Sequence, residues 1–240
     1  MKTARYYGIE DIRYEELPVP NCGEKDVLIK VAYAGICGSD LHIYKKGMFI
    51  QNIPETMGHE FSGTVIKTGS KVHSLQAGDR VTANPMVTCG NCIACRTERR
   101  GSCETLGFIG EVRPGCFAEY IALPQEDVIK APPDINLKKL ALAEPLAVAL
   151  NICRQAKPAP TDKVLIVGPG PIGLLTALVL KNVCGLENPT ILGRSPARLS
   201  IAKALGMKTT TQLGDDSYFD LIIEAAGNET ALSTAVAHAL

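Results

Sequence analysis

Four cysteines lie close together near the middle of the chain, with the spacing C-x2-C-x2-C-x7-C. They are Cys89, Cys92, Cys95 and Cys103. Four thiolates that converge from one loop can occupy all four positions around a tetrahedral zinc ion. A site with no free position stabilises structure and does not catalyse a reaction. An iron–sulfur cluster is the nearest alternative, but the comparable ligand run ends in Cys-Pro after three residues, whereas Glu104 follows Cys103. The spacing therefore predicts structural zinc, with unliganded loop thiols as the other alternative.

A second group of metal-ligating residue types lies upstream, in two separate segments. Cys37 occurs in Gly-Ile-Cys-Gly-Ser-Asp-Leu-His, and His59 and Glu60 occur in Gly-His-Glu-Phe-Ser-Gly. Together they offer one sulfur, one nitrogen and one oxygen ligand and leave a fourth position free, as catalytic zinc sites do. Taken singly, Cys37 could be a core residue and His59 a buried histidine bonded to backbone. Their combination with the nucleotide motif described next favours a catalytic zinc site.

A glycine-rich motif, G-x-G-x-x-G, directly follows an apolar run predicted to be a buried strand and opens a predicted helix. The motif is weak alone and strong in this context. Gly168 permits the tight turn, Gly170 lets backbone approach a pyrophosphate, and Gly173 lets helix and strand pack closely. The free N–H groups of the helix N-terminus then face the phosphates. The residues expected to bind cofactor here are Gly168, Gly170, Pro171, Ile172 and Gly173; a glycine turn without a ligand is the alternative.

The end of the following strand predicts which nicotinamide cofactor binds. An NAD-binding version presents Asp or Glu about 20 residues after the glycine motif. This chain has Gly193, Arg194 and Ser195 there, with Arg198 one turn later. Without a carboxylate nothing repels a 2′-phosphate, and a guanidinium and a hydroxyl can bind it. We therefore expect NADP(H), with NAD(H) as the alternative in which Arg194 faces solvent.

The elements that must position these residues change in type along the chain. Residues 1 to about 135 read as short strands between Gly and Pro signals, which is typical of an irregular β-barrel or sandwich. Helical spacing begins at Leu137, and alternating α/β elements follow a linker over residues 155–163. The expected strands are 27–33, 61–65, 80–83, 117–122, 164–167, 190–192, 208–211 and 221–224, and the expected helices are 137–143, 145–154, 171–183, 196–205 and 229–240.

The composition argues against several classes of protein. Lys plus Arg equals Asp plus Glu at 25 each, so the chain lacks the positive charge that draws proteins to nucleic acid or acidic membranes. A zinc-finger-like nucleic-acid-binding module is therefore an unfavoured alternative. The N-terminus lacks the apolar core of a signal peptide, and the longest apolar stretch is too short to span a membrane. Nine cysteines, four of them in one loop, favour a reducing cytoplasm over a disulfide framework.

The run Gly58-His59-Glu60-x2-Gly63-x5-Gly69-x2-Val72 resembles the signature of zinc-containing alcohol dehydrogenases of the medium-chain dehydrogenase/reductase family. The four-cysteine loop and the later glycine motif follow in the order that this family uses. The run Ala143-Glu144-Pro145-Leu146 further resembles the sorbitol, butanediol and threonine dehydrogenase branch. The resemblance implies a GroES-like irregular β-barrel catalytic domain in residues 1–153, followed by an incomplete Rossmann doubly wound parallel sheet of about four strands in residues 154–240.

The resemblance also implies a reaction. Zinc acts as a Lewis acid, and hydride passes between a secondary alcohol or polyol and the nicotinamide ring. Ser39 would take the substrate proton and pass it through the cofactor ribose to His42, while Asp40 would orient a ligand imidazole. His42 as a plain surface residue is the alternative.

In this branch a glutamate sits near the metal, and Glu144 matches that position. A carboxylate between apolar runs is costly unless a cation or a donor compensates it. A solvent-facing break between helices at Pro145 is the alternative. Whether Glu144 or water completes the zinc coordination stays open.

The nucleotide-binding half has fewer strands than the family pattern. A doubly wound dinucleotide fold orders six strands 3-2-1-4-5-6, and four are found here. We therefore expect a C-terminally truncated enzyme with an exposed edge strand at 221–224, low solubility and little turnover. A small-molecule alcohol is the expected partner, and a homo-oligomer is expected of the full-length pattern. Threonine or sugar-phosphate dehydrogenation on the same scaffold and an inactive remnant with structural zinc only are the alternatives.

Overall fold

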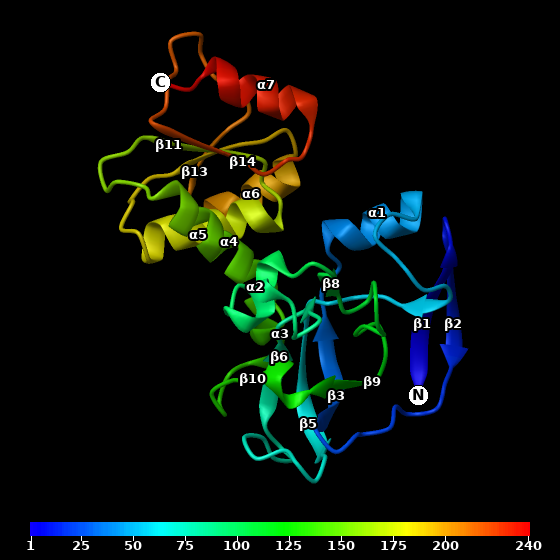
Figure 1. The fold of residues 1–240 in the computed structure, drawn as a ribbon. Coiled ribbons are helices and arrows are strands. Elements are labelled where there is room, and N and C mark those ends of the chain that lie inside the picture. The colour runs from blue at the N-terminus through cyan, green and yellow to red at the C-terminus, as the bar shows by residue number, and fades with distance from the viewer. The chain divides into compact units, whose positions relative to one another are not determined.

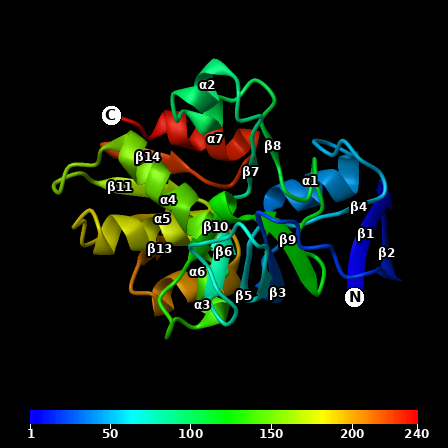
Figure 2. The same cartoon turned by 60° about the horizontal axis from the view of Figure 1, so that its bottom comes forward.

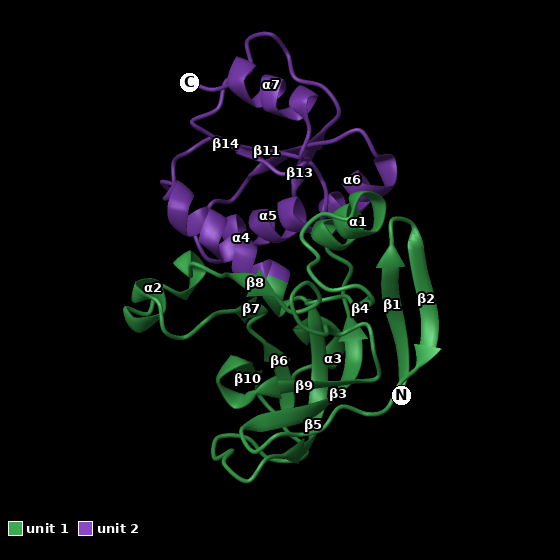
Figure 3. Cartoon of the chain, turned by 45° about the vertical axis from the view of Figure 1, so that its right-hand side comes forward, with its two compact units in different colours: residues 1–144 green, residues 145–240 purple.

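The computed structural model describes residues 1–240, which form two compact units, Met1–Glu144 and Pro145–Leu240 (Figures 1 and 3). The predicted boundary after residue 153 lies later in the chain than this division. Helix α4 (Ala143–Ala156) explains the difference, because its residues Ala149 and Cys153 are buried in the core of the second unit. None of the helices combines the length and the apolar character that a bilayer crossing requires.

Unit 1 is built from short antiparallel strands, as the sequence predicts. One sheet has the order β10-β6-β5-β3-β9, a second has the order β2-β1-β4, and β7 pairs with β8. The pairing of β3 with β5 shifts register twice, and such irregularities bend a sheet. The strands are β1 (Lys2–Gly8), β2 (Asp11–Glu16), β3 (Asp26–Ala34), β4 (Glu55–Thr56), β5 (Phe61–Thr68), β6 (Arg80–Ala83), β7 (Met86–Val87), β8 (Gly107–Phe108), β9 (Tyr120–Pro124) and β10 (Val128–Lys130).

Alternate residues of these strands form the core of unit 1. Val27 and Ile29 on β3 belong to one hydrophobic cluster with Phe61 and Val65 on β5, and all four are almost fully buried. Strand β9 begins at Tyr120 rather than at the predicted residue 117. Residues just before it are instead bonded across to β1 and to the segment before His59, for example Phe117 N–H to Met57 O at 2.9 Å.

Helix α1 (Gly38–Lys46) was not foreseen, because Gly-Ser-Asp reads as loop sequence. Cys37 is its N-cap, and the carboxylate of Asp40 accepts the backbone N–H of Cys37 at 2.8 Å. This contact satisfies one of the N–H groups that the helix start leaves free. The remaining short helices of unit 1 are α2 (Ile93–Arg96), η1 (Arg100–Ser102), η2 (Gln125–Asp127) and α3 (Leu137–Leu140).

Unit 2 has one parallel sheet with the order β13-β12-β11-β14, which is the start of the doubly wound order 3-2-1-4. Side chains of β11 alternate between its faces: Val164 and Ile166 pack with α4, α5 and α6, whereas Leu165 and Val167 pack with α7. Figures 1 and 2 show α7 on the opposite side of the sheet from α5 and α6. The elements are β11 (Val164–Val167), α5 (Pro171–Asn182), β12 (Thr190–Leu192), α6 (Pro196–Ala204), β13 (Lys208–Thr210), β14 (Leu221–Glu224) and α7 (Glu229–Ala237).

Among the helix boundaries that differ from the sequence prediction, two have a clear physical reason. Pro145 lies inside the first turn of α4, where the prediction began a new helix, because a proline there removes no intrahelical hydrogen bond. Helix α7 ends at Ala237 rather than at residue 240, and the N–H of Phe219 bonds the carbonyl of His238 instead. Strand β14 lies at the edge of the sheet, as predicted.

Replacing Gly173 by alanine should destabilise the protein by about 1–3 kcal/mol, because a Cβ there would lie 2.0 Å from the carbonyl oxygen of Gly168. Gly170→Ala is the matched control, since no atom lies within 4 Å of the added Cβ. Urea denaturation of the two variants measures the difference. Equal stability of both variants would contradict the close approach of turn and helix.

Candidate metal centres and nucleotide-binding cavity

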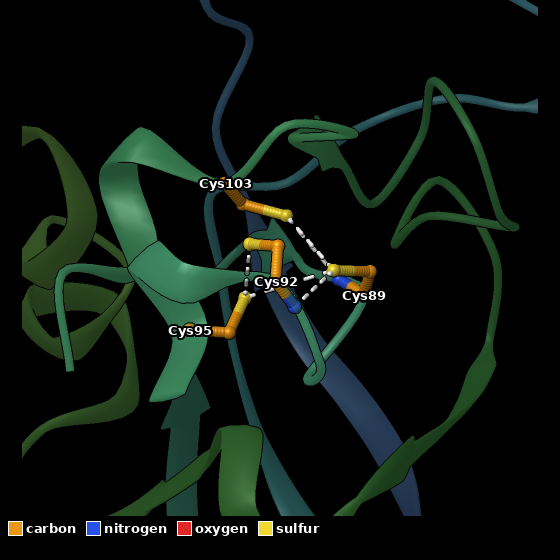
Figure 4. A group of neighbouring side chains, drawn as sticks. All are labelled: Cys89, Cys92, Cys95 and Cys103. Carbon is orange, nitrogen blue, oxygen red and sulfur yellow. Dashed lines mark hydrogen bonds between the residues drawn. The ribbon is translucent and has the colours of Figure 1, made fainter. Parts of the chain in front are cut away.

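The four predicted zinc cysteines converge in unit 1 (Figure 4). Cys92 caps α2, Cys95 lies within it, and Cys103 follows η1. The sulfur–sulfur distances are 3.5 Å for Cys92–Cys95, 3.6 Å for Cys103–Cys89 and 3.9 Å for Cys89–Cys95. Four ligands at a zinc–sulfur distance of 2.3 Å would stand about 3.8 Å apart at the corners of a tetrahedron. The cluster therefore has the dimensions of a four-thiolate zinc site, and its sulfurs are too far apart for disulfides.

Backbone N–H groups stabilise negative charge on these sulfurs. The N–H of Cys89 donates to Cys103 Sγ at 3.3 Å, and the N–H of Cys92 donates to Cys89 Sγ at 3.4 Å. The first of these bonds lowers the pKa of Cys103 to about 6. Burial and the adjacent Cys92 thiol instead raise the pKa of Cys95 to about 11. All four thiols can therefore ionise together only if a cation offsets their repulsion.

Cys37, His59 and Glu60 also come together, and their ligand atoms lie within 4.8 Å of one another. The pairing of Ala34 on β3 with Phe61 on β5 brings the two segments side by side. The N–H of Gly35 then donates to the carbonyl of Glu60 at 2.7 Å. A side chain at Gly35 would collide with the Glu60 carboxylate, because its Cβ would lie 2.2 Å from Oε2. The strand pairing therefore sets the geometry of the group.

This second group is rich in buried anionic side chains. Burial raises the pKa of Glu60, and the charge of His59 opposes the increase. Burial alone would lower the pKa of His59, but Cys37, Asp40 and Glu144 together raise it to about 9. Asp40 Oδ1 is buried without a hydrogen-bond partner. Thiolate and carboxylate groups in such a site need a cation, so the donor set fits zinc.

The structure also locates the other predicted catalytic residues. Glu144 is half-buried, and its pKa is raised by burial and by Glu60 and lowered by His59, but it lies outside the 4.8 Å ligand group. Ser39 is half-buried and His42 exposed, three residues apart on α1. Asp40 differs from its predicted contact, since its hydrogen bond is to the N–H of Cys37 rather than to an imidazole.

Two residues beside this group, Phe108 and Glu111, carry no signal in the sequence. The ring of Phe108 lies 6.5 Å from the ring of His59, centroid to centroid. Glu111 is half-buried, and burial raises its pKa while the charge of His59 lowers it. Neither residue belongs to a recognisable motif, because tertiary folding alone brings residues 108–111 to His59.

Unit 2 contains a cavity of about 440 Å³ at the carboxyl ends of its parallel strands. Ligands of doubly wound sheets bind at this edge. Gly168, Gly170 and Gly193 line the cavity, and Gly168 has φ of +117°, which glycine adopts without strain. Pro171, Ile172 and Gly173 lie in the first turn of α5 and do not line it.

Two charged residues line this cavity, and both are arginines, Arg194 and Arg198. Ser195 also lines the cavity, and its hydroxyl accepts the N–H of Arg198 at 3.4 Å as the N-cap of α6. The arginines are exposed at the cavity rim and free of ion pairs. The cavity is therefore suited to an anionic ligand.

The opposite wall of the cavity is not among the residues that the sequence predicts to bind cofactor. It consists of the loop from Ala225 to Asn228 and the start of α7. Glu224 Oε1 shapes this loop by accepting the N–H groups of Ala226 at 2.7 Å and Gly227 at 2.8 Å. The position after a parallel strand was a usable signal, since such loops line the ligand edge of the sheet.

Comparisons with known proteins agree on one family. Residues 23–133 match the family described as the alcohol dehydrogenase GroES-like domain. L-threonine 3-dehydrogenase of Legionella pneumophila is 36% identical over 91% of this chain and 68% of its own length. Sorbitol dehydrogenase of Bacillus subtilis is 34% identical over 99% of this chain and 71% of its own length.

Solved structures share the fold. A zinc-binding dehydrogenase of Sinorhizobium meliloti, solved with NADP bound, superposes with a TM-score of 0.92 at 30% identity and covers 99% of this chain and 73% of its own. The 2R,3R-butanediol dehydrogenase of Bacillus subtilis gives 0.88 at 34% identity, covering 99% of this chain and 74% of its own.

In the zinc-free protein, the free energy of unfolding should fall as pH rises from 6.5 to about 9. The pKa of His59 is raised from 6.5 to about 9 on folding, so its protonated form stabilises the folded state. This contribution is fully present below 6.5 and is lost as pH passes 9. A His59→Gln variant should lack this loss, which amounts to at most about 3 kcal/mol.

Urea denaturation in the presence of a chelator, repeated across this pH range, measures the effect. His42→Gln is the control, because His42 is exposed on the same unit, and it should keep the wild-type pH dependence. If His59→Gln kept it as well, the electrostatic description of the site would be wrong.

Proposed function

This chain belongs to the zinc-dependent alcohol dehydrogenases of the medium-chain dehydrogenase/reductase family, and on that premise we propose that it oxidises a secondary alcohol or polyol with NADP⁺. The observation that carries the proposal is the convergence of Cys37, His59 and Glu60 at the paired ends of two strands, with ligand atoms within 4.8 Å. One sulfur, one nitrogen and one oxygen leave a position for substrate, as a catalytic site requires.

Each residue of the site has a proposed role. Cys37, His59 and Glu60 hold zinc, and the hydrogen bond from Cys37 N–H to Asp40 keeps the Cys37 backbone in place. When bound, zinc supplies a Lewis acid and the nicotinamide supplies a hydride acceptor. Ser39 Oγ would accept the proton of the substrate hydroxyl as it releases its own hydroxyl proton towards His42, and the exposed His42 would exchange that proton with solvent. Glu144 contributes negative charge at the edge of the site.

A second zinc is proposed at the four-cysteine cluster, where the sulfur spacing supports a closed structural site. These thiols must stay reduced to bind metal, which supports a cytoplasmic location. The salt bridge of Arg100 with the buried Asp127, at 2.7 Å, anchors the loop that carries Cys103. We therefore propose two zinc ions per chain.

The preference for NADP(H) is supported by charge. Arg194 and Arg198 line the nucleotide cavity, and no carboxylate lines it. A guanidinium binds a phosphate through charge-assisted, paired hydrogen bonds, whereas NAD(H) would offer these arginines no 2′-phosphate. NAD(H) is the alternative cofactor.

The substrate proposal stays at the level of class. Threonine, sorbitol and butanediol, which give similar proteins their names, all contain a secondary alcohol. Threonine or a sugar phosphate is the alternative substrate, and a structural remnant that binds a single zinc is the alternative function. Zinc content per chain separates the enzyme from the remnant.

Replacing Cys37 by serine should reduce zinc from two ions to one per chain and lower turnover by at least about 100-fold, because a metal ligand is lost. Metal analysis and NADP⁺ reduction measure the two effects. Cys22→Ser is the matched control, since Cys22 belongs to neither cluster. Wild-type zinc content in Cys37→Ser would remove the catalytic assignment.

Replacing Arg194 by alanine should lower kcat/KM for NADP⁺ by about 10- to 100-fold and leave that for NAD⁺ nearly unchanged, because a charge-assisted contact with the 2′-phosphate is lost. Lys203→Ala is the control, because Lys203 lies on α6 outside the cavity. A wild-type protein that prefers NAD⁺ would overturn the cofactor proposal.

A further inference from the structure

The side chain of Glu111 has no partner although its backbone is firmly held. Its N–H donates to Phe108 O at 3.1 Å, and its carbonyl accepts the N–H of Gln51 at 3.0 Å. The next residue, Val112, is held by Asn52 Nδ2 at 3.2 Å. The carboxylate itself forms no hydrogen bond and no salt bridge, yet it is half-buried. A rigid loop thus presents an unpaired, partly desolvated acid.

The loop over residues 110–116 packs against the segment that carries His59. A Cβ at Gly110 would lie 2.6 Å from the nitrogen of Gly58, and one at Gly115 would lie 2.2 Å from its carbonyl oxygen. The N–H of Cys116 donates to the same carbonyl at 2.9 Å. Because Gly58 directly precedes His59, the loop has little freedom to move relative to the candidate zinc site.

Several observations place Glu111 within the electrostatic environment of that site. The charges of His59 and Asp40 both act on its carboxylate, and burial raises its pKa. Phe108, which binds the Glu111 N–H, also faces the His59 ring. Glu111 is nevertheless absent from the group of ligand atoms around Cys37. Glu111 therefore lies on a loop next to the proposed reaction centre without being a ligand.

We infer that Glu111 determines substrate specificity by accepting a hydrogen bond from a second donor on the substrate, a hydroxyl of a polyol or an ammonium of an amino alcohol. The inference rests on the proposed function. The carboxylate is only partly buried and has no protein donor, so a substrate that supplies a donor while it displaces water is favoured over one that leaves the acid unpaired. An anionic substituent is repelled, which disfavours sugar phosphates.

The test compares Glu111→Leu and Glu111→Gln with wild type. Four probes differ in the group that accompanies the reacting alcohol. 2-Butanol has no second donor, and 2,3-butanediol has a second hydroxyl. 1-Amino-2-propanol has an ammonium, and sorbitol 6-phosphate has an anionic phosphate. Glu111→Leu should raise KM for 2,3-butanediol about 10- to 100-fold, since a hydrogen bond to a charged group is lost. The KM for 2-butanol should stay within about 2-fold of the wild-type value. Glu187→Leu, at an exposed acid of unit 2, is the control.

Glu111→Gln distinguishes the two donors. Gln keeps an acceptor but loses the charge, so binding of the diol should be largely retained and binding of the amino alcohol lost. The same variant should bind the phosphorylated polyol more tightly than wild type does. Zinc per chain should stay unchanged in both variants, as expected for a residue that is not a ligand.

Calorimetric titration of the zinc-loaded proteins with each probe provides a measurement independent of turnover. Weaker diol binding in Glu111→Leu with unchanged 2-butanol binding supports the inference. It is overturned if wild type binds both alcohols alike, or if the variant weakens both equally. If wild type oxidises none of the alcohols, the proposed function fails, and the calorimetric comparison still decides the role of Glu111.

Discussion

The antiparallel pairing of β3 with β5 is the interaction on which the candidate catalytic site depends. It brings the segment after Ala34 beside the segment before Phe61, and the hydrogen bond from Gly35 to Glu60 extends the pairing into the site. Cys37 is the N-cap of helix α1, and His59 and Glu60 directly precede β5. Three ligand types therefore meet because two strand ends meet, and the small Gly35 leaves room for the carboxylate.

The two candidate metal sites of unit 1 share an excess of anionic groups. Both clusters gather more anionic atoms than their protein surroundings can compensate. Asp40 has a buried oxygen without a donor, and the pKa of Cys103 and that of Cys95 are displaced in opposite directions. Sulfur spacings of 3.5–3.9 Å are too long for bonds between sulfurs and suit a shared metal. Folding and metal binding are thus expected to be linked in unit 1.

Unit 2 places its glycine-rich turn at the edge of the parallel sheet where ligands of doubly wound folds bind. Gly173 allows α5 to begin against the carbonyl of Gly168, and Gly170, the N-cap of α5, lines the cavity. The neighbouring strand ends then supply Arg194 and the loop that Glu224 shapes. Binding chemistry is therefore carried by loops, while the four-stranded sheet holds them in register.

The sequence by itself determined the features that are local. Strands at 164–167, 190–192 and 221–224 and the helices after them follow from short apolar runs and glycine or proline signals, and the structure has these three strands at the predicted residues. The four-cysteine cluster was equally predictable from the sequence, because its members come from one loop.

Tertiary structure alone decided the rest. Helix α1 depends on a cap between Cys37 and Asp40, the unit boundary depends on where α4 packs, and Phe108 and Glu111 reach His59 only through folding. Such contacts join residues far apart in the chain, so neither spacing nor composition carries a signal for them.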